Sequence, residues 1–245
     1  GILRLQNFKL ATETTEPPVT PLPKVTKFNV STYNCVDTRF GGKINDDGAV
    51  VRALASSINL LTEAPEAVRN AIRVARGGKD KFLVWTREDS KSQAILFEKA
   101  KWSHTTKGNV VFGPTSYHGA VVAVLTHKAT KLKVQFACLH MPPSKIYSST
   151  AEAEKARKKY FKKLIDALDP KLPTVIGGDF NSSNVESWAK EYGYIAAPTG
   201  ATTNSGKRLD WLLIKGGQFD KVKVIDAGKA SDHKAVKAQA IFWRN

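Results

Sequence analysis

The feature that most constrains this chain is a series of apolar, strand-like segments that each stop or start at a chemically capable polar side chain. The segment 28–34 (FNVSTYN) alternates apolar and polar residues, as a half-buried strand does, and ends at Asn34. The segments INLLTE and VQFACLH end at Glu63 and His140. A side chain at the end of a strand is held rigidly by its sheet. The series therefore predicts a site assembled from strand ends.

The second half of the chain continues this series. TVIGGDFN closes with Asp179 and Asn181, Asp210 stands at the start of the apolar run WLLI, and Asp232 and His233 open the last strand. Carboxylates and amides supply the hard oxygen ligands that Mg²⁺ or Mn²⁺ prefers, and imidazoles can move protons near neutral pH. The sequence contains no zinc-type Cys/His spacing, no GxxxxGK[ST] loop and no GxSxG elbow. The set favours metal-assisted attack by water on a phosphate ester.

Patterns typical of helices separate the strand-like segments. Asp46 can start one helix, and Pro65 suits the first turn of a second helix that Gly77 ends. Ser149 and Glu152 form a candidate capping box for a third helix. The apolar face of that third helix recurs at three- and four-residue steps and consists of Tyr160, Phe161, Leu164, Ile165 and Leu168.

The expected strands are long and outnumber the helices. They span residues 28–34, 58–63, 82–85, 94–97, 120–125, 132–140, 174–179, 209–214, 222–225 and 235–242. Long strands with few helices between them suggest mixed or antiparallel sheets covered by helices. The pattern predicts an α/β (α+β) fold.

The beginning of the chain differs in composition from the rest. Residues 11–24 (ATETTEPPVTPLPK) are crowded with threonine and proline and contain almost nothing to bury. We therefore expect an N-terminal arm or linker over residues 1–26, which could tether the protein to an upstream domain. Residues 27–245 are expected to form one domain and a monomer.

The sequence offers little information about location. The first residues, GILR, contain neither a methionine nor a charged-then-apolar secretory signal. No apolar run approaches the roughly 20 residues that a membrane-spanning helix needs. We expect a cytoplasmic protein, with secretion as the alternative if an upstream signal has been removed.

The charge balance favours a polyanionic partner. Lys and Arg number 38 against 22 Asp and Glu, which gives a net charge of +16. Each neutralised phosphate releases counterions, so such an excess raises affinity for nucleic acid and for anionic lipid surfaces. A solubilising surface without a specific partner is the plainer alternative.

Two cysteines are too few for a disulfide framework. Cys35 and Cys138 both lie in strand-like apolar segments. This position favours buried free thiols over a single bridge.

Other polar and aromatic residues are less informative. His104, His118 and His127 match no motif, and we expect them to be ordinary surface or core residues. Trp211 adjoins Leu212 and Leu213, which favours a core position over a stacking platform. Loop residues that could grip a phosphate backbone or stack on bases are Arg39, Phe40, Lys145, Tyr147 and Arg208.

Taken in order, the motifs TYN, LLTE, CLHMPP, GGDFNSS, KRLDWLLI and ASDHKAV resemble the endonuclease/exonuclease/phosphatase (DNase I-like) superfamily. The resemblance runs from about residue 27 to residue 243. GDFN and SDH, with R-[IL]-D-[YW] between them, are its specific pieces, whereas each motif alone is weak. The resemblance implies a four-layered sandwich of two packed mixed β-sheets flanked by helices, with the site at one edge.

The resemblance also implies roles for the residues at the strand ends. Glu63 would be the main ligand of Mg²⁺ or Mn²⁺, assisted by Asn34 and Asp232. Asp179 and His233 would activate or orient the attacking water. Which of these two is the base stays open, because such coupled groups can share a proton.

The remaining roles concern the phosphate and its leaving group. Asp210 would support His233, while Asn181 and His140 would hold phosphate oxygens and His140 could protonate the leaving oxygen. Abasic-site endonucleases have a tyrosine at the position of His140. The histidine of this chain therefore favours the DNase I-like, phosphatase and sphingomyelinase branches. DNase I pairs this histidine with a glutamate that has no clear counterpart over residues 91–98.

Three functions follow from these observations. The first is a nuclease that hydrolyses nucleic acid, DNA more than RNA. The second is a phosphoinositide or sphingomyelin-type phosphoesterase, although the chain shows no long apolar insertion that would enter a bilayer. The third is a catalytically silent nucleic-acid-binding module.

Overall fold

The computed structural model describes residues 25–35, 50, 56–78, 82–86, 93–112, 117–198, 200–228 and 230–243. Residues 1–24 of the expected arm lie outside this part of the chain, as do Arg39, Phe40 and nearly all of the helix expected from Asp46. The first strand already begins at Val25, inside the expected arm.

The first sheet is six-stranded and has the order β11-β12-β1-β2-β4-β3. Its strands are β1 (Val25–Asn34), β2 (Ile58–Thr62), β3 (Phe82–Thr86), β4 (Ala94–Glu98), β11 (Gln218–Ile225) and β12 (Ala235–Trp243). β1 pairs in parallel with β2 and antiparallel with β12, so the sheet is mixed. The carboxyl ends of β1 and β2 therefore meet at one edge.

The second sheet is also six-stranded and has the order β5-β6-β7-β8-β10-β9. Its strands are β5 (Trp102–Val111), β6 (Gly119–His127), β7 (Lys133–His140), β8 (Thr174–Asp179), β9 (Ile195–Ala197) and β10 (Asp210–Lys215). β7 and β8 are parallel, whereas β8 and β10 are antiparallel. The end of β7, the end of β8 and the start of β10 consequently lie side by side.

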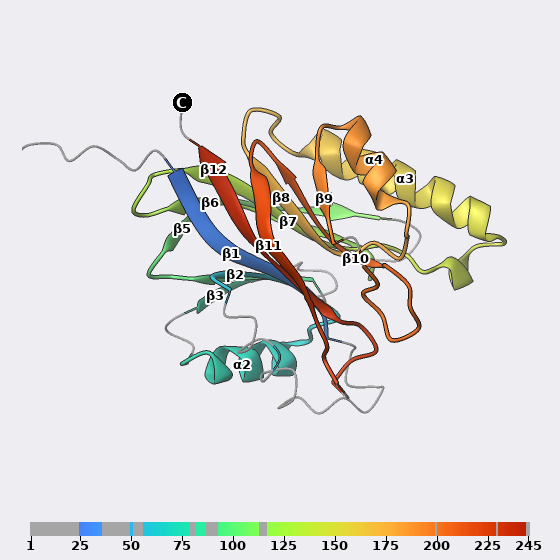
Figure 1. Ribbon diagram of the computed structural model, residues 1–245, viewed down its shortest axis with the longest axis horizontal. Coiled ribbons are helices and arrows are strands. Elements are labelled where there is room, and N and C mark those ends of the chain that lie inside the picture. The colour runs from blue at the N-terminus through green and yellow to red at the C-terminus, as the bar shows by residue number, and fades with distance from the viewer. Residues whose placement is uncertain are drawn as a thin grey trace, which may run out of the picture.

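The two sheets pack face to face and helices cover their outer faces (Figure 1). α2 (Glu66–Ala75) covers the first sheet, and α3 (Thr150–Ala167) and α4 (Val185–Glu191) cover the second. Three buried apolar clusters fill the spaces between these layers. The predicted four-layered α/β sandwich of two mixed sheets flanked by helices is confirmed.

The structure adds two strands and one α-helix that the sequence pattern missed. β5 is an edge strand whose segment SHTTKGNV is mostly polar and exposed, so it lacks the apolar signature of a strand. β9 and α4 have only 3 and 7 residues, too few to show a clear periodicity. The other described strands match the expected ones within a few residues at each end.

The cysteine prediction is confirmed, since Cys35 and Cys138 are free and buried. The Cys138 thiol lies 3.2 Å from the carbonyl oxygen of Leu61, which belongs to the other sheet. Burial strongly raises the pKa of this thiol, so it stays protonated and donates across the sheet interface. Both cysteines therefore serve as core residues.

The start of α3 is capped, with one departure from the expected pattern. Ser149 Oγ accepts a hydrogen bond of 3.1 Å from the backbone N–H of Glu152, as predicted. The Glu152 carboxylate, however, accepts from the backbone N–H of Ser148 at 3.0 Å. The reciprocal half of the box is thus made one residue earlier than the motif implies.

We expect Ser149→Ala to lower the free energy of unfolding by about 1 kcal/mol, because an N-terminal N–H of α3 would lose its acceptor. Urea denaturation followed by circular dichroism would measure this change. Ser183→Ala, at an exposed loop serine, should change stability by less than about 0.5 kcal/mol. Equal effects of the two substitutions would contradict the assigned cap.

Candidate active site

The polar strand ends of the two sheets meet at one edge of the sandwich. Within the second sheet, Asp179 is in register with both His140 and Asp210. From the first sheet, the buried Asn34 side chain donates to Asp179 Oδ2 at 3.1 Å and to Glu63 Oε1 at 3.2 Å. Asn34 is thus a cross-sheet link between the two carboxylates.

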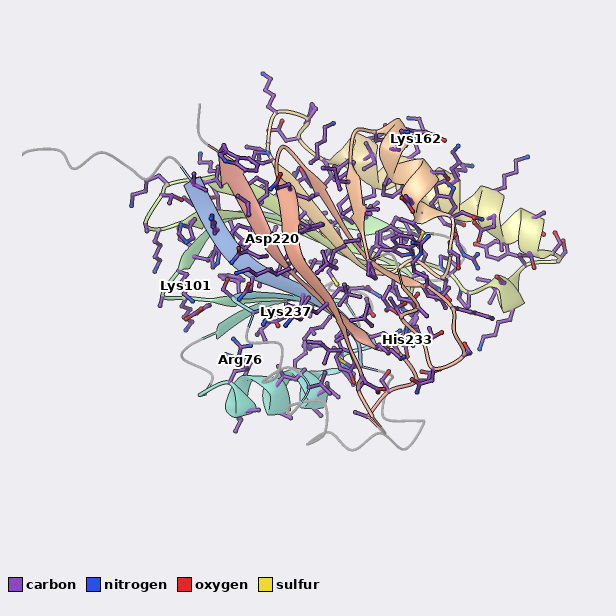
Figure 2. The ribbon with its side chains drawn as sticks, viewed as in Figure 1. Arg76, Lys101, Lys162, Asp220, His233 and Lys237 are labelled. Atoms are coloured by element: carbon purple, nitrogen blue, oxygen red, sulfur yellow. The ribbon has the colours of Figure 1, made fainter. Side chains whose placement is uncertain are left out.

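A pocket of about 500 Å³ opens at this edge. Its walls come from both sheets and from the loop after β7, and they consist of Glu63, Tyr117, His118, His140, Pro143, Lys145, Ile146, Asp179, Asn181 and His233. Figure 2 shows His233 at the same end of the sheets, just before β12 begins. Residues widely separated in the sequence therefore share one cavity.

One side of the pocket has the composition of a cation site. Glu63, His140 and Asp179 each offer a ligand atom, and these atoms lie within 4.8 Å of one another. His140 Nε2 is 3.7 Å from Glu63 Oε1 and 3.7 Å from Asp179 Oδ2. Carboxylate oxygens packed this closely repel one another unless a cation or a proton lies between them. The donor set, rich in oxygen, fits a hard divalent ion.

The other side of the pocket contains an imidazole between two carboxylates. His233 Nδ1 lies 2.7 Å from Asp210 Oδ2, and Nε2 lies 3.8 Å from Asp179 Oδ2. Burial alone would lower the pKa of His233, but the charges of Asp210 and Asp179 outweigh it and raise that pKa to about 10. His233 is therefore an imidazolium at neutral pH, with both ring nitrogens able to donate.

The two aspartates of this arrangement are less acidic than exposed ones. Burial is the main cause, and it raises the pKa of Asp179 and of Asp210 against the opposing charge of His233. Either aspartate therefore takes up a proton more readily than an exposed aspartate does, and the three neighbouring side chains titrate as a coupled group. This property suits proton transfer from a water molecule.

The loop after β8 fixes the position of the Asn181 side chain. Its backbone has φ 51°, a left-handed conformation that asparagine tolerates. The backbone N–H of Asn181 donates to Asp179 Oδ1 at 2.8 Å, and its side-chain amide donates to the carbonyl of Met141 at 2.8 Å. Glu63 likewise has a positive φ, of 48°. For a glutamate this left-handed backbone is strained, whereas an asparagine adopts it more readily.

A turn over residues 202–207 supports Asp210. Thr202 Oγ1 accepts hydrogen bonds from the backbone N–H groups of Leu209 and Asp210, each at 2.9 Å. The carbonyl of Thr202 accepts from the backbone N–H of Lys234, next to His233, at 2.7 Å. This turn therefore positions both members of the Asp210–His233 pair, and the segment ATTN showed no sign of this role in the sequence.

Comparison with known proteins agrees with this geometry. A model described as the Endonuclease/Exonuclease/phosphatase family matches residues 21–233, which is most of the chain. The chain belongs to the endonuclease/exonuclease/phosphatase family. Members of this family are phosphoesterase hydrolases. A search of curated proteins found no match.

Solved structures of the endonuclease/exonuclease/phosphatase fold resemble the chain over most of its length. A family protein from Bacteroides thetaiotaomicron has a TM-score of 0.71 and 16% identity, covering 90% of this chain and 99% of that one. D. rerio TDP2 complexed with single-strand DNA product has a TM-score of 0.67 and 14% identity, with coverages of 88% and 99%. A Bacteroides thetaiotaomicron mannosyl-6-phosphatase has a TM-score of 0.69 and 15% identity, covering 88% of this chain and 100% of that one. At these identities the likeness shows the shared fold.

The structure gathers nearly all of the residues that the family motifs singled out. Those that converge on the pocket or contact its wall are Asn34, Glu63, His140, Asp179, Asn181, Asp210 and His233. Asp232 is exposed, and among the described residues it belongs to neither group of three or more candidate metal ligands. Its charge still contributes to the raised pKa of His233.

Two pocket residues were missed by the motif analysis of this family member. His118 was expected to be an ordinary residue, yet it lines the pocket together with Tyr117. The rings of His118 and Tyr117 lie 5.0 and 5.6 Å from that of His140. His140 Nδ1 has no hydrogen-bond partner within the described part of the chain. The edge contacts with these rings therefore help to hold the His140 imidazole in place.

The loop residues expected to contact a substrate behave differently from one another. Lys145 lines the pocket. The Arg208 guanidinium lies 4.1 Å from the ring centroid of Trp211, which is fully buried as predicted. The hydroxyl of Tyr147 is buried, and burial strongly raises its pKa. Of these three side chains, only that of Lys145 lies in the pocket.

Proposed function

We propose that the protein is a Mg²⁺-dependent phosphodiesterase, and specifically a nuclease that hydrolyses DNA by attack of water on phosphorus. One observation carries this proposal: two carboxylates, an amide and three imidazoles from separate segments of the chain meet in a single pocket. RNA is the secondary substrate in this proposal.

The cation would be held mainly by Glu63, with Asn34 and Asp232 assisting. Glu63 is the carboxylate on the pocket wall that has an exposed portion, since its side chain is 20% accessible against 3% for Asp179. Bound there, Mg²⁺ would neutralise the charge that accumulates on phosphoryl oxygens during the reaction. Mn²⁺ has the same preference for oxygen ligands and should substitute.

The proton transfers would be performed by the other half of the pocket. Asp179 and His233 would orient the attacking water, and the Asp179–His233–Asp210 cluster would take up its proton as one unit. Asn181 and His140 would donate hydrogen bonds to phosphate oxygens. His140 would then supply a proton to the leaving oxygen.

The choice of nucleic acid rests on charge and on one structural neighbour. The chain has a net charge of +16, and D. rerio TDP2, a protein of the same fold, is known with a single-strand DNA product. A second candidate is a phosphatase or phospholipase acting on anionic head groups. It is supported by the mannosyl-6-phosphatase that also shares the fold.

Purified protein should nick supercoiled plasmid with Mg²⁺ or Mn²⁺ and stop doing so when a chelator is added. Glu63→Gln should lower the nicking rate by about 10²-fold or more, because the amide loses the charge that attracts the cation. Glu191→Gln alters an exposed glutamate paired with Lys158 on the helical face and should leave the rate unchanged. Gel electrophoresis of the plasmid over time gives all three rates.

Other outcomes of that experiment separate the alternatives. Absence of nicking, while a known nuclease cuts in parallel, would remove the DNA assignment. Phosphate release from inositol phosphates or lipid head groups under the same conditions would then favour the phosphatase. Salt-sensitive DNA binding without hydrolysis under any divalent ion would favour a silent binding module.

A further inference from the structure

An ion pair on α3 between the buried Arg157 and the partly exposed Glu154 lies outside the pocket and has no part in the reaction as described above. Arg157 is 1% exposed and donates from three nitrogens. Nε donates to the carbonyl of Pro142 at 2.9 Å, Nη2 to Ser144 Oγ at 2.8 Å, and Nη1 to Glu154 Oε1 at 2.7 Å. The guanidinium thus attaches the loop after β7 to α3.

The second oxygen of Glu154 holds a different loop. Glu154 Oε2 accepts hydrogen bonds from Ser182 Oγ at 2.7 Å and from Asn184 Nδ2 at 3.3 Å. Ser182 Oγ in turn accepts from the backbone N–H of Asn184 at 3.1 Å. The Glu154 carboxylate therefore bridges the loop after β8 to Arg157.

These two loops directly follow the strand ends that carry the chemistry. The loop held by Arg157 follows His140, and the loop held by Glu154 contains Asn181 and follows Asp179. Asn181 itself spans them on the pocket side, through its bond to the carbonyl of Met141. A groove of about 480 Å³ beside the pocket is lined by both loops, by Glu154 and by Arg157.

We propose that Glu154 is a positioning residue that, through Arg157 and Ser182, sets the distance between these loops and so places Asn181 beside the scissile phosphate. A buried guanidinium is expensive to desolvate, and a fully bonded one contributes geometry more than stability. The five hydrogen bonds of the pair described above end on one of the two loops or within the pair itself. The inference rests on the proposed function, because it assigns Glu154 an effect on that reaction.

Glu154→Gln tests this proposal, since the amide keeps the size of the side chain but offers one acceptor oxygen instead of two. We expect kcat for plasmid or oligonucleotide hydrolysis to fall about 10-fold or more, with KM changed less than about twofold. Glu191→Gln is the matched control and should leave both constants unchanged. A proportional loss of folded protein, measured by urea denaturation, would instead show a purely structural role.

A double-mutant cycle with Asn181→Ala decides how Glu154 acts. If Glu154 works by positioning Asn181, Glu154→Gln should change kcat less than about twofold once Asn181 is alanine. If the kcat of the double variant is lowered by the product of the two single losses, the proposal is overturned. Ser182→Ala removes a single link of the network and provides a second variant should Glu154→Gln fail to fold.

A readout without activity separates this inference from the proposed function. In a ¹H–¹⁵N correlation spectrum, the side-chain amide resonances of Asn181 should shift in Glu154→Gln and stay in place in Glu191→Gln. Unmoved resonances would refute the positioning role even in a fully active enzyme. If the wild-type protein is inactive but Glu154→Gln still shifts the Asn181 resonances, the nuclease assignment is refuted and the coupling between the loops is established.

Discussion

Asp179→Asn should lower kcat for phosphodiester hydrolysis by about 10³-fold while the protein remains folded. Asp179 lies at the centre of the site, 3.8 Å from His233 Nε2 and 3.7 Å from His140 Nε2. Asparagine has the same shape but cannot accept a proton, so both the water and the imidazolium of His233 would lose their charged partner. Steady-state kinetics with Mg²⁺ on a fluorescent oligonucleotide would measure the loss.

The fold should tolerate this change because the carboxylate is already unfavourable where it lies. Burial is the main cause that raises the pKa of Asp179, and it outweighs the opposing charge of His233, so a neutral side chain at this position avoids the desolvation of the carboxylate. The cost is the loss of one acceptor oxygen, to which the side-chain amides of Asn34 and Asn181 both donate. Asp166→Asn, at an exposed residue paired with Lys162 on α3, is the matched control and should keep full activity. Retention of more than a tenth of kcat in Asp179→Asn would exclude Asp179 from the chemical step.

Gly178→Ala should lower the free energy of unfolding by about 4 kcal/mol or more, or prevent folding altogether. Gly178 has φ 146°, and a Cβ placed there would lie 1.9 Å from the carbonyl oxygen of Leu139. Leu139 is its register partner on β7, so the collision is with backbone that belongs to a central pair of the sheet. No side-chain rotation can relieve it.

This clash also bears on the site, because His140 and Asp179 are the next residues along those two strands. Any fraction of Gly178→Ala that folds should therefore have a lower kcat per folded molecule. Gly108→Ala is the control, since a Cβ at Gly108 meets nothing within 4 Å. Urea denaturation should place the control within about 0.5 kcal/mol of wild type. Similar stabilities for the two alanine variants would contradict the close approach of β7 and β8.

Strands that are buried on both faces could be predicted most directly from the sequence. β8 and β10 are buried on both faces, so their apolar runs TVIGG and WLLI stand out from the surrounding sequence. β5 is an edge strand with exposed polar residues, and its position is set by pairing with β6. Such a strand owes its conformation to a neighbour and has no apolar pattern of its own.

The members of the candidate site could be singled out in the sequence because each one lies at the end or the start of an apolar run. Asp179 and His140 are register partners on the parallel strands β7 and β8, so two residues that each end a strand also lie next to each other in space. The link between Asn34 and Asp179 depends on how the two sheets are stacked, and no local pattern encodes that arrangement. His118 and Tyr117 were missed for another reason: they match no motif, and they reach the pocket through the pairing of β6 with β7 within the second sheet.

The polar support behind the pocket was also beyond prediction. Arg157 lies among lysines on α3, and its sequence context marks it as one more surface cation. Its burial follows from the loop that folds over it and from the carboxylate at Glu154, three residues earlier. Likewise Thr202 bonds to Asp210 only because a turn brings them together. Bonds between a loop and a distant element depend on the finished fold.

The placement of the pocket across the seam between the two sheets has a consequence for when this protein can act. Asn34 and Glu63 come from one sheet and His140 and Asp179 from the other. A chain with either sheet formed alone would hold half of the reactive groups and no cavity. The protein should therefore become able to hydrolyse a phosphoester only after the two sheets have packed together. Newly synthesised or partly unfolded molecules should be inactive.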